Sequence, residues 1–311
     1  MKTYNSLQEF IPARPTIVTL GTFDGVHKGH KSILEKLIKS SQATGYESLV
    51  LTFFPHPRMV LQQNTDIRLL NTMAEKAHLL ENFGIDNLII HPFSHEFSRL
   101  TAEEFVSDIL VDKLQTQKII IGYDHRFGRN RTADINDLKR FGEQYGFEVE
   151  EISALEVNEV SVSSTKIRSA LNEGHIKTAN KYLGYPYFIN GSVVSGKQLG
   201  RTIGFPTANI KVSEEYKLIP SNGVYAVSAP LGDKTVLGMM NIGIRPTVDG
   251  TTRMIEAHFF DFDEDLYNKD ITVSLHYRLR DEQKFESVDA LKEQLKKDKE
   301  DTLHYFNQNQ L

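Results

Sequence analysis

Glycines and histidines share one stretch of the chain, GTFDGVHKGHKSIL at residues 21–34, with a spacing that suits phosphate chemistry. Glycine lets the backbone approach a ligand closely and adopt positive φ. A helix that begins near His30 would add unpaired N–H groups and the positive end of its dipole, which bind anions. Because His27 lies three residues before His30, both imidazoles can point at one phosphate group. The candidate phosphate-binding glycines are Gly21, Gly25 and Gly29.

Nucleotidyl transfer is the chemistry that this stretch predicts. When a phosphate oxygen attacks the α-phosphorus of ATP, negative charge builds on the oxygens of that phosphorus, and oriented donors stabilise it without a covalent nucleophile. The two histidines also fit a helix-capping turn with surface imidazoles, or a zinc site. The position between a predicted strand and a predicted helix favours phosphate binding. A P-loop is excluded, because the sequence has no Walker A pattern.

A second candidate phosphate clamp is SVSSTKIRSAL at residues 161–171, which leads into a short predicted helix. Hydroxyl groups, a helix N-terminus and basic side chains together suit a phosphate. The alternative is a purely structural role, in which Ser or Thr caps the helix and the basic residues face solvent. The residues concerned are Ser163, Ser164, Thr165, Lys166 and Arg168.

Two further loops follow predicted strands, FFPHPR at residues 53–58 and GYDHRFGRNRTAD at residues 122–134. Both would lie at the same edge of the sheet as the histidine stretch, and this position argues for a functional role. In the second loop Phe127 is available to line a ring pocket. The alternatives are a proline turn for the first loop and a polar surface loop for the second. The basic residues of the second loop are Arg126, Arg129 and Arg131.

The first half of the chain alternates short apolar runs with helical patterns, which predicts an α/β fold with a Rossmann-like, doubly wound parallel sheet. Ligands of such sheets bind at the carboxyl ends of the strands. Thr101 and Glu104 form a capping-box pattern at the start of one helix. The predicted strands are 15–21, 47–54, 87–93, 118–122 and 147–152, and the predicted helices are 34–40, 73–84, 101–114 and 135–146.

The pattern changes near residue 185, where strand-like segments separated by Gly, Asn, Asp and Pro begin. Their spacing predicts an antiparallel β-barrel or sandwich. Residues 287–306 predict a C-terminal helix with Ser287 as its N-cap. We place the domain boundary between Tyr185 and Pro186, which gives domains of residues 1–185 and 186–311.

The composition limits the function classes. The chain has 311 residues with 36 basic and 41 acidic side chains, and its net charge of −5 argues against a broad nucleic-acid surface. The sequence contains no cysteine, which excludes disulfides, thiolate metal sites and cysteine nucleophiles. Neither a signal-peptide core nor an apolar run of about 18 residues is present. We therefore expect a cytoplasmic protein that acts on small molecules, without nucleic-acid or membrane partners.

The stretch GTFDGVHKGH resembles the HxGH signature of the nucleotidylyltransferase superfamily, in the form found in prokaryotic FAD synthetases. SSTKIR is similar to the second phosphate-binding motif of that superfamily, and FFPHPR and GYDHRFG resemble further flavin-adenylyltransferase motifs. The family commonly has Phe where His125 stands and often Gly where Ala133 stands. The resemblance implies catalysis by His27 and His30, nucleotide binding that includes Phe23 and Asp24, and flavin contacts from Pro55, His56, Asp124, Arg126 and Phe127.

The segment GKQLGRTIGFPTANI at residues 196–210 resembles the signature loop of riboflavin kinases, and SNGVYAV, NIGIRPTV, IEAHFFDFDEDLY and RLRDEQKFESVDAL match that family in the same order. Together the two resemblances imply a prokaryotic bifunctional riboflavin kinase/FMN adenylyltransferase. Such an enzyme uses ATP and Mg²⁺ to convert riboflavin to FMN and FMN to FAD. The implied nucleotide contacts are Gly196, Gly200, Arg201, Gly204 and Pro206, and the implied flavin contacts are Asn222, Tyr225, Arg245 and Arg280.

Phosphoryl transfer from ATP to a hydroxyl needs a metal ion and a base near that hydroxyl. Thr207 and Asn209 are two residues apart on a strand-like segment, so both can face one side, and the resemblance assigns the Mg²⁺–ATP contact to them. The resemblance also makes Glu256 the general base. Alternatively, the pair is part of a plain turn, and Glu256 lies on a solvated strand face while Ile255 and Ala257 face the core.

Two other functions remain as alternatives. One is a nucleotidylyltransferase that acts on a pantetheine or nicotinate phosphate, with the barrel as a passive appendage. The other is a flavin-storing or flavin-sensing protein without ATP turnover. The motifs of the second half argue against the first alternative, and an assay for ATP consumption would test the second.

Overall fold

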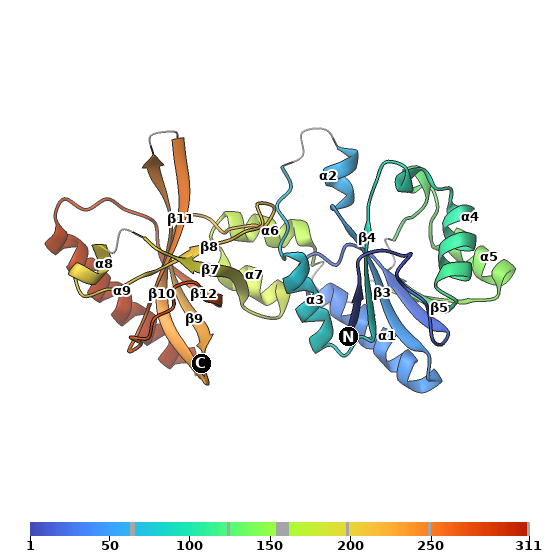
Figure 1. The fold of residues 1–311 in the computed structure, drawn as a ribbon, viewed down its shortest axis with the longest axis horizontal. Helices are drawn as coiled ribbons and strands as arrows, with labels where there is room; N and C mark the ends of the chain where they lie inside the picture. The colour runs from blue at the N-terminus through green and yellow to red at the C-terminus, as the bar shows by residue number, and fades with distance from the viewer. Residues whose placement is uncertain (63–65, 123–124, 154–161, 197–198, 248–249, 310–311) are drawn as a thin grey trace. The chain divides into compact units, whose positions relative to one another are not determined.

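A computed structural model describes the chain except for residues 63–65, 123–124, 154–161, 197–198, 248–249 and 310–311 (Figure 1). The described residues form two compact units, Met1–Ser163 and Ser164–Leu311. Buried apolar clusters lie within each unit, so each has a hydrophobic core of its own.

The first unit is built on a six-stranded sheet in which every neighbouring pair of strands is parallel. The five strands expected from the apolar runs are confirmed. A sixth strand, β1, was not predicted, because its three residues contain no apolar run. The strand order is β1 (Lys2–Tyr4), β4 (Asn87–Pro92), β3 (Glu47–Phe54), β2 (Thr16–Leu20), β5 (Thr116–Gly122) and β6 (Glu148–Ile152).

Helices cover both faces of this sheet, as the continuous apolar strands predicted. Within β2, Ile17 packs with Leu34 and Leu80 on one face, while Val18 packs with Phe105 and other residues on the opposite face. The first face is covered by α1 (Lys28–Thr44) and α3 (Met73–Asn82), and the second by α4 (Ala102–Glu104), a π-helix (Phe105–Lys113) and α5 (Ile135–Tyr145). The shorter helices are α2 (Pro57–Leu61) and two 3₁₀ turns, Phe97–Arg99 and Arg129–Arg131.

The helix predicted over residues 101–114 is present, and Thr101 and Glu104 form its capping box. The helix type differs from the expected α-helix, because the turns after Glu104 are π-helical. Consistent with this, the Leu114 N–H donates to the Ile109 carbonyl, five residues back, at 2.9 Å. Apolar spacing predicts where a helix lies but does not distinguish these two windings.

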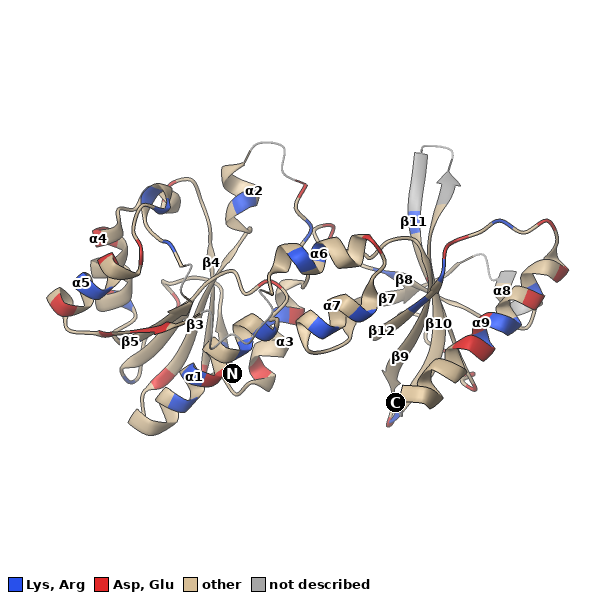
Figure 2. Cartoon of the chain, turned by 180° about the vertical axis from the view of Figure 1, so that it is seen from behind, with Lys and Arg blue, Asp and Glu red and all other residues tan. Residues whose placement is uncertain are grey.

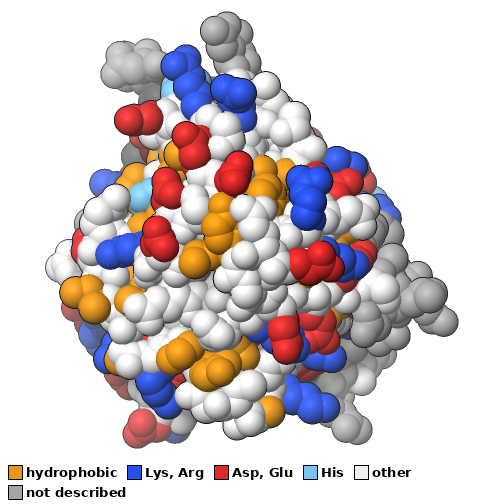
Figure 3. All heavy atoms as spheres, turned by 90° about the vertical axis from the view of Figure 1, so that its right-hand side faces the viewer, with side chains coloured by type: hydrophobic (Ala, Val, Ile, Leu, Met, Phe, Trp, Pro, Cys, Tyr) orange, Lys and Arg blue, Asp and Glu red, His pale blue; other side chains and the backbone are white. Residues whose placement is uncertain are grey.

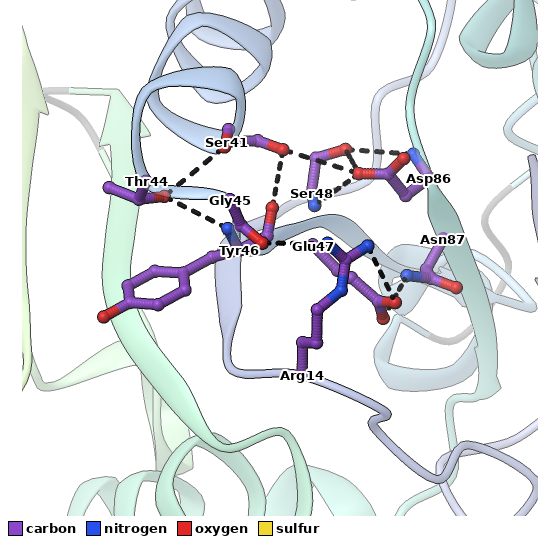
Figure 4. A network of polar contacts seen from close by, with 9 residues as sticks. All are labelled: Arg14, Ser41, Thr44, Gly45, Tyr46, Glu47, Ser48, Asp86 and Asn87. Atoms are coloured by element: carbon purple, nitrogen blue, oxygen red, sulfur yellow. Dashed lines mark hydrogen bonds and ion pairs between the residues drawn. The ribbon is translucent and has the colours of Figure 1, made fainter.

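At the amino ends of the strands, a polar network ties β3 to β4 (Figure 4). Asp86 accepts hydrogen bonds from the Ser48 backbone N–H at 2.8 Å and from the Ser48 hydroxyl at 2.7 Å. Beside it, Glu47 accepts from the Asn87 amide at 3.1 Å and pairs with Arg14 at 3.5 Å. The polar groups at this edge of the sheet bind one another, so their role here is structural.

The second unit contains a closed six-stranded barrel, which confirms the predicted β-barrel. All neighbouring strands in it are antiparallel. The strand order is β10 (Lys234–Thr247), β11 (Gly250–Phe259), β8 (Ala208–Lys211), β7 (Tyr187–Val194), β12 (Asp270–Arg280) and β9 (Gly223–Leu231). The helices are α6 (Ser164–Asn172), α7 (Ile176–Leu183), α8 (Leu199–Thr202) and α9 (Val288–Asn309).

Helix α7 contacts the barrel and helix α9 through the side chains of Asn180 and Lys177. The Asn180 amide donates to the Leu275 carbonyl at 2.8 Å, and its oxygen accepts from the Tyr187 N–H at 2.8 Å. The Lys177 ammonium lies 4.7 Å from the ring centroid of Tyr277 and 5.2 Å from that of Tyr305 on α9. These contacts explain why α7 belongs to the same compact unit as the barrel.

The C-terminal helix α9 docks on the barrel through a buried carboxylate. Asp298 is 1% exposed and receives two hydrogen bonds from Arg280 of β12, at 2.9 and 2.7 Å. Phe306 is also buried, whereas the helix carries both acidic and basic residues elsewhere (Figure 2). The predicted cap is confirmed, because the Ser287 hydroxyl accepts from the Ala290 N–H at 3.1 Å.

Acidic and basic side chains are interspersed on the face shown in Figure 3, and apolar side chains form only small patches between them. This mixture agrees with the modest net charge of the chain. Within the described ranges, no helix combines the length and the apolar character needed to span a membrane.

Candidate active sites

The histidine stretch lies where the sheet order changes direction. Strand β2 has β3 on one side and β5 on the other, so the connections from β2 and β5 diverge at their carboxyl ends. Such a switch point is where doubly wound sheets bind ligands. The helix that follows, α1, begins at Lys28, two residues earlier than expected, and His27 is its N-cap without a side-chain capping bond. Within its first turn the His30 N–H donates to the His27 carbonyl at 2.7 Å, and the positive end of the helix dipole favours an anion at this terminus.

The two histidine rings form one stacked pair. Their centroids are 3.7 Å apart with an interplanar angle of 15°, and the Phe23 ring lies 4.9 Å from that of His30. The Nδ1 atom of His30 is buried and has no hydrogen-bond partner among the described residues. Desolvation, together with the charges of His27 and Lys76, holds the pKa of His30 well below its usual value. His30 is therefore neutral at pH 7 and has a ring nitrogen available for a ligand.

The loop that carries these rings is conformationally strained. Phe23 and Val26 adopt φ values of 43° and 35°, which non-glycine residues rarely do, and Gly25 has φ of 88°. Each non-glycine outlier costs on the order of 1–3 kcal/mol and persists only where the surroundings impose it. Both side chains are 2% exposed, so the core imposes this shape. Gly21 is also constrained, because a Cβ there would lie 3.3 Å from the Phe23 ring.

Two buried charged residues hold the same loop. Asp24 is 1% exposed and accepts from the Leu70 N–H at 2.9 Å and from the Asn71 N–H at 3.4 Å. Lys76 of α3 is 2% exposed and donates to the Thr22 carbonyl at 2.7 Å. Lys76 was not predicted as a site residue from the sequence. The available signal was its position four residues before Leu80, on the buried face of an amphipathic helix.

The FFPHPR loop turns sharply from β3 into the short helix α2. The peptide bond between Phe54 and Pro55 is cis, and Pro55 is exposed. His56 is the N-cap of α2, and its Nδ1 accepts from the Arg58 N–H at 3.1 Å. In this structure His56 thus has a capping role.

In the loop after β5, Asp124 lies outside the described residues. Arg126 is exposed, whereas Phe127 is 7% exposed and packs in the core with Phe105. Phe127 also exchanges two backbone hydrogen bonds with Ala133, at 3.1 and 3.2 Å. The methyl group of Ala133, where the family often has glycine, is buried in that core. The His125 ring lies parallel to the Phe127 ring at 6.2 Å.

The predicted second phosphate clamp divides between the two units. Ser163 is the last residue of the first unit, and Ser164 begins α6 in the second. Thr165 and Lys166 are exposed, whereas Arg168 is half-buried. These residues occupy a helix N-terminus, as expected from the sequence.

In the barrel, strand register places the candidate base beside the candidate metal ligand. Glu256 of β11 lies directly opposite Asn209 of β8 on one side and Asn241 of β10 on the other. Directly opposed residues of antiparallel strands project from the same face. Ile255 and Ala257 are 6% and 1% exposed, so they point into the barrel and Glu256 points out of it. This agrees with the alternation read from the sequence.

Asn209 is held in a tight environment. A Cβ added to Gly196 would lie 2.2 Å from the Asn209 Nδ2, so a larger residue at position 196 would displace the Asn209 amide. The Asn209 side chain is 8% exposed, and its Oδ1 has no hydrogen-bond partner among the described residues. A buried oxygen in this state is suited to a ligand or an ion.

The glycine loop before Asn209 forms a compact turn. The Gly200 carbonyl accepts from the Phe205 N–H at 2.8 Å, and Gly204 has φ of 86°. The Pro206 carbonyl lies 2.7 Å from the Nδ1 of His258, two residues beyond Glu256. Because a carbonyl oxygen can only accept, this nitrogen carries the proton. The Arg201 side chain lies outside the part of the chain that the structure describes.

The remaining predicted flavin contacts of the barrel make structural bonds. Tyr225 is fully buried and its hydroxyl donates to the Ser221 carbonyl, while the Asn222 amide donates to Glu282 at 3.3 Å. Arg280 is paired with the buried Asp298 of α9. The Arg245 side chain lies outside the described residues. Elsewhere in the described part of the chain, no cluster of three or more His, Asp or Glu is placed to hold a metal ion.

Comparison with known proteins matches each half of the chain to a family model. The model described as FAD synthetase matches residues 11–166, and the model described as riboflavin kinase matches residues 183–306. A solved structure from Streptococcus pneumoniae, named a macrolide-efflux protein, has a TM-score of 0.88 at 32% identity and covers 97% of this chain and 98% of its own.

Curated relatives match nearly the whole chain. The bifunctional riboflavin kinase/FMN adenylyltransferase of Escherichia coli (strain K12) is 37% identical over 296 residues, which are 95% of this chain and 94% of that protein. The protein of the same name from Buchnera aphidicola subsp. Schizaphis graminum is 40% identical over 294 residues, 93% of this chain and 94% of its own. With a family model on each half and relatives of this identity along its length, the chain belongs to the bifunctional riboflavin kinase/FMN adenylyltransferase family.

Proposed function

We propose that residues 1–185 adenylylate FMN to FAD with release of pyrophosphate, and that residues 186–311 phosphorylate riboflavin to FMN. Both reactions use ATP, so the chain is a transferase with two ATP-dependent activities. The order of the two family models along the chain supports this division of labour.

Adenylyl transfer is assigned to the histidine loop. A phosphate oxygen of FMN attacks the α-phosphorus of ATP, the bond to the β-phosphate oxygen breaks, and pyrophosphate leaves. The single observation that supports this role is the stacked pair of His27 and His30 at the start of α1. Their ring N–H groups and the positive end of the α1 dipole stabilise the charge that develops on the α-phosphate oxygens. Asp24 holds the loop by accepting a hydrogen bond from the Leu70 N–H. The reaction needs no covalent nucleophile.

Phosphoryl transfer is assigned to the outer face of the barrel. The Glu256 carboxylate accepts the proton of the ribityl hydroxyl as that oxygen attacks the γ-phosphorus of ATP and ADP leaves. The observation that supports this role is the register that sets Glu256 opposite Asn209. The bond between His258 and the Pro206 carbonyl fixes the segment that leads to Asn209.

Mg²⁺ is assigned to Thr207 and Asn209. The buried Asn209 Oδ1, without a partner among the described residues, is an oxygen donor of the kind that Mg²⁺ prefers. When bound with ATP, the ion neutralises phosphate charge. The chain's own contribution is to hold the Asn209 amide in place through the close approach of Gly196.

The other assignments follow from motif position. The hydroxyl and basic groups at the start of α6 bind phosphate, and the loops after β3 and β5 contact the flavin of FMN. Pro55 and Arg126 are exposed at these loops, which supports a contact with substrate. The partners are small molecules, and the enzyme acts in the cytoplasm, which fractionation of cells would test.

A time course tests the proposed function. The purified chain is incubated with riboflavin, ATP and Mg²⁺, and FMN and FAD are followed by chromatography. FMN should appear first and FAD later, with stoichiometric ADP and pyrophosphate. Binding of flavin without ATP consumption would instead identify a flavin-storing protein.

A further inference from the structure

One buried ammonium group near the histidine loop has no role in the chemistry assigned above. Lys76 is 2% exposed, directly follows Glu75 of the α3 capping box, and donates from Nζ to the Thr22 carbonyl at 2.7 Å. Lysine is almost never fully buried unless it is paired, because desolvation of the ammonium is costly. The position therefore indicates a task that offsets this cost.

The Thr22 carbonyl is the anchor of the strained turn. It accepts from Lys76 on α3 and also from the Thr52 hydroxyl on β3, at 3.2 Å. The next residue, Phe23, is the first of the positive-φ residues that direct the chain toward His27. Two elements far apart in the sequence thus hold one carbonyl group immediately before the strained backbone.

Charged and titratable groups surround the ammonium on the loop and on α1. Asp24 raises the pKa of Lys76, but burial is the larger effect and lowers this pKa to about 8. On α1, the charge of Lys76 and that of His27 both contribute to the lowered pKa of His30. Lys76 therefore supplies positive charge next to the loop that carries the histidine pair.

We propose that Lys76 is a positioning residue for adenylyl transfer, whose ammonium holds the Thr22 carbonyl and thereby the turn that presents His27 and His30. Its charge also balances the buried carboxylate of Asp24. This inference rests on the proposed assignment of adenylyl transfer to the histidine loop.

Substitution separates this role from simple packing. Lys76→Met keeps the length and apolar stem but removes the donor and the charge, and should lower kcat for FAD formation by about 10²-fold, the effect of a misplaced catalytic group. Lys76→Arg retains charge and donors and should recover part of the rate. Riboflavin phosphorylation by the same chain is the internal control. Lys217→Met is the matched control, because Lys217 is 3% exposed and donates to the Phe188 carbonyl, but in the barrel unit.

The pH dependence supplies a readout that packing alone would not move. Lys76 is charged below its pKa and loses the proton as pH rises through about 8. In the wild-type protein, kcat/KM for FAD formation, which reports the free enzyme, should therefore fall as pH rises through about 8. This alkaline limb should be absent in Lys76→Arg, because arginine stays protonated. It should also be absent in Lys76→Met, at a lower rate throughout.

The proposal is overturned if Lys76→Met forms FAD within twofold of the wild-type rate, or if Lys76→Arg retains the alkaline limb. If neither variant folds, the wild-type profile decides, since a constant kcat/KM between pH 7 and 9 contradicts the role. Failure of the proposed function has a different signature, namely normal FAD formation in His30→Ala.

Discussion

The two candidate sites place their polar groups in contrasting surroundings. The histidine loop is buried, contains positive-φ backbone at Phe23 and Val26, and is held by charged groups that are themselves buried. The barrel site uses an ordinary strand, in which Glu256 projects outward between two amide side chains. In the proposed function the first site stabilises charge with fixed donors, whereas the second uses a base that exchanges a proton. A rigid loop keeps its donors in fixed positions, which suits charge stabilisation. A carboxylate on an outer strand face can exchange protons, which suits a base.

The barrel site should be the more sensitive to one side chain. Glu256→Gln keeps the shape but removes the base, and should slow riboflavin phosphorylation by about 10²–10⁴-fold. FAD formation from supplied FMN should be unchanged, as measured by chromatography. Glu264→Gln, at an exposed position, is the matched control. A normal kinase rate in Glu256→Gln would exclude Glu256 as the base.

The histidine site should lose its activity independently. His30→Ala removes one of the fixed donors and should lower FAD formation by about 10²–10³-fold, the usual effect of losing one such group. FMN formation should persist, so FMN accumulates in the coupled assay. His78→Ala, an exposed histidine on α3, is the control. Equal loss of both reactions would contradict the separation of the two sites.

The independence of the two units can be tested through stability. Asp298→Ala leaves Arg280 without its buried partner and should destabilise the second unit by about 3 kcal/mol. Calorimetry should show a lower Tm for that unit, while FAD formation from FMN continues. The control is Asp301→Ala, an exposed position on the same helix. A parallel fall in the adenylylation rate would show that the two units are energetically coupled.

A smaller effect should come from crowding the barrel site. Gly196→Ala adds a Cβ that would overlap the Asn209 amide, so that the amide must move. We expect roughly a tenfold rise in the KM for Mg–ATP in the kinase reaction, on the order of 1.4 kcal/mol of binding free energy. Steady-state kinetics of Ser195→Ala, at the exposed neighbouring position, provide the comparison. An unchanged KM would mean that Asn209 does not contact the nucleotide.

The periodicity of apolar residues predicted most of the fold, because apolar strands and capped helices have recognisable sequence patterns. It could not find β1, which pairs with β4 through a short polar segment. It also could not show that Phe127 packs in the core, since an aromatic residue in a loop reads equally well as a ligand contact.

The proximity of His27 and His30 was predictable, because both residues lie within one short segment. The pairing of Glu256 with Asn209 depends on strand register, which no single segment encodes. Lys76 was missed because a lysine within a helix usually faces solvent, and its burial is a property of the tertiary structure.

The alternation along β11 has a consequence for how this gene can vary. Ile255 and Ala257 fill the barrel, while Glu256 between them projects outward beside Asn209. Deleting one residue upstream in this strand would invert every position, sending the carboxylate inward and an apolar group outward. Natural selection should therefore remove insertions and deletions from β11 even where it tolerates single substitutions. The length of this strand should vary less among related genes than its amino-acid composition.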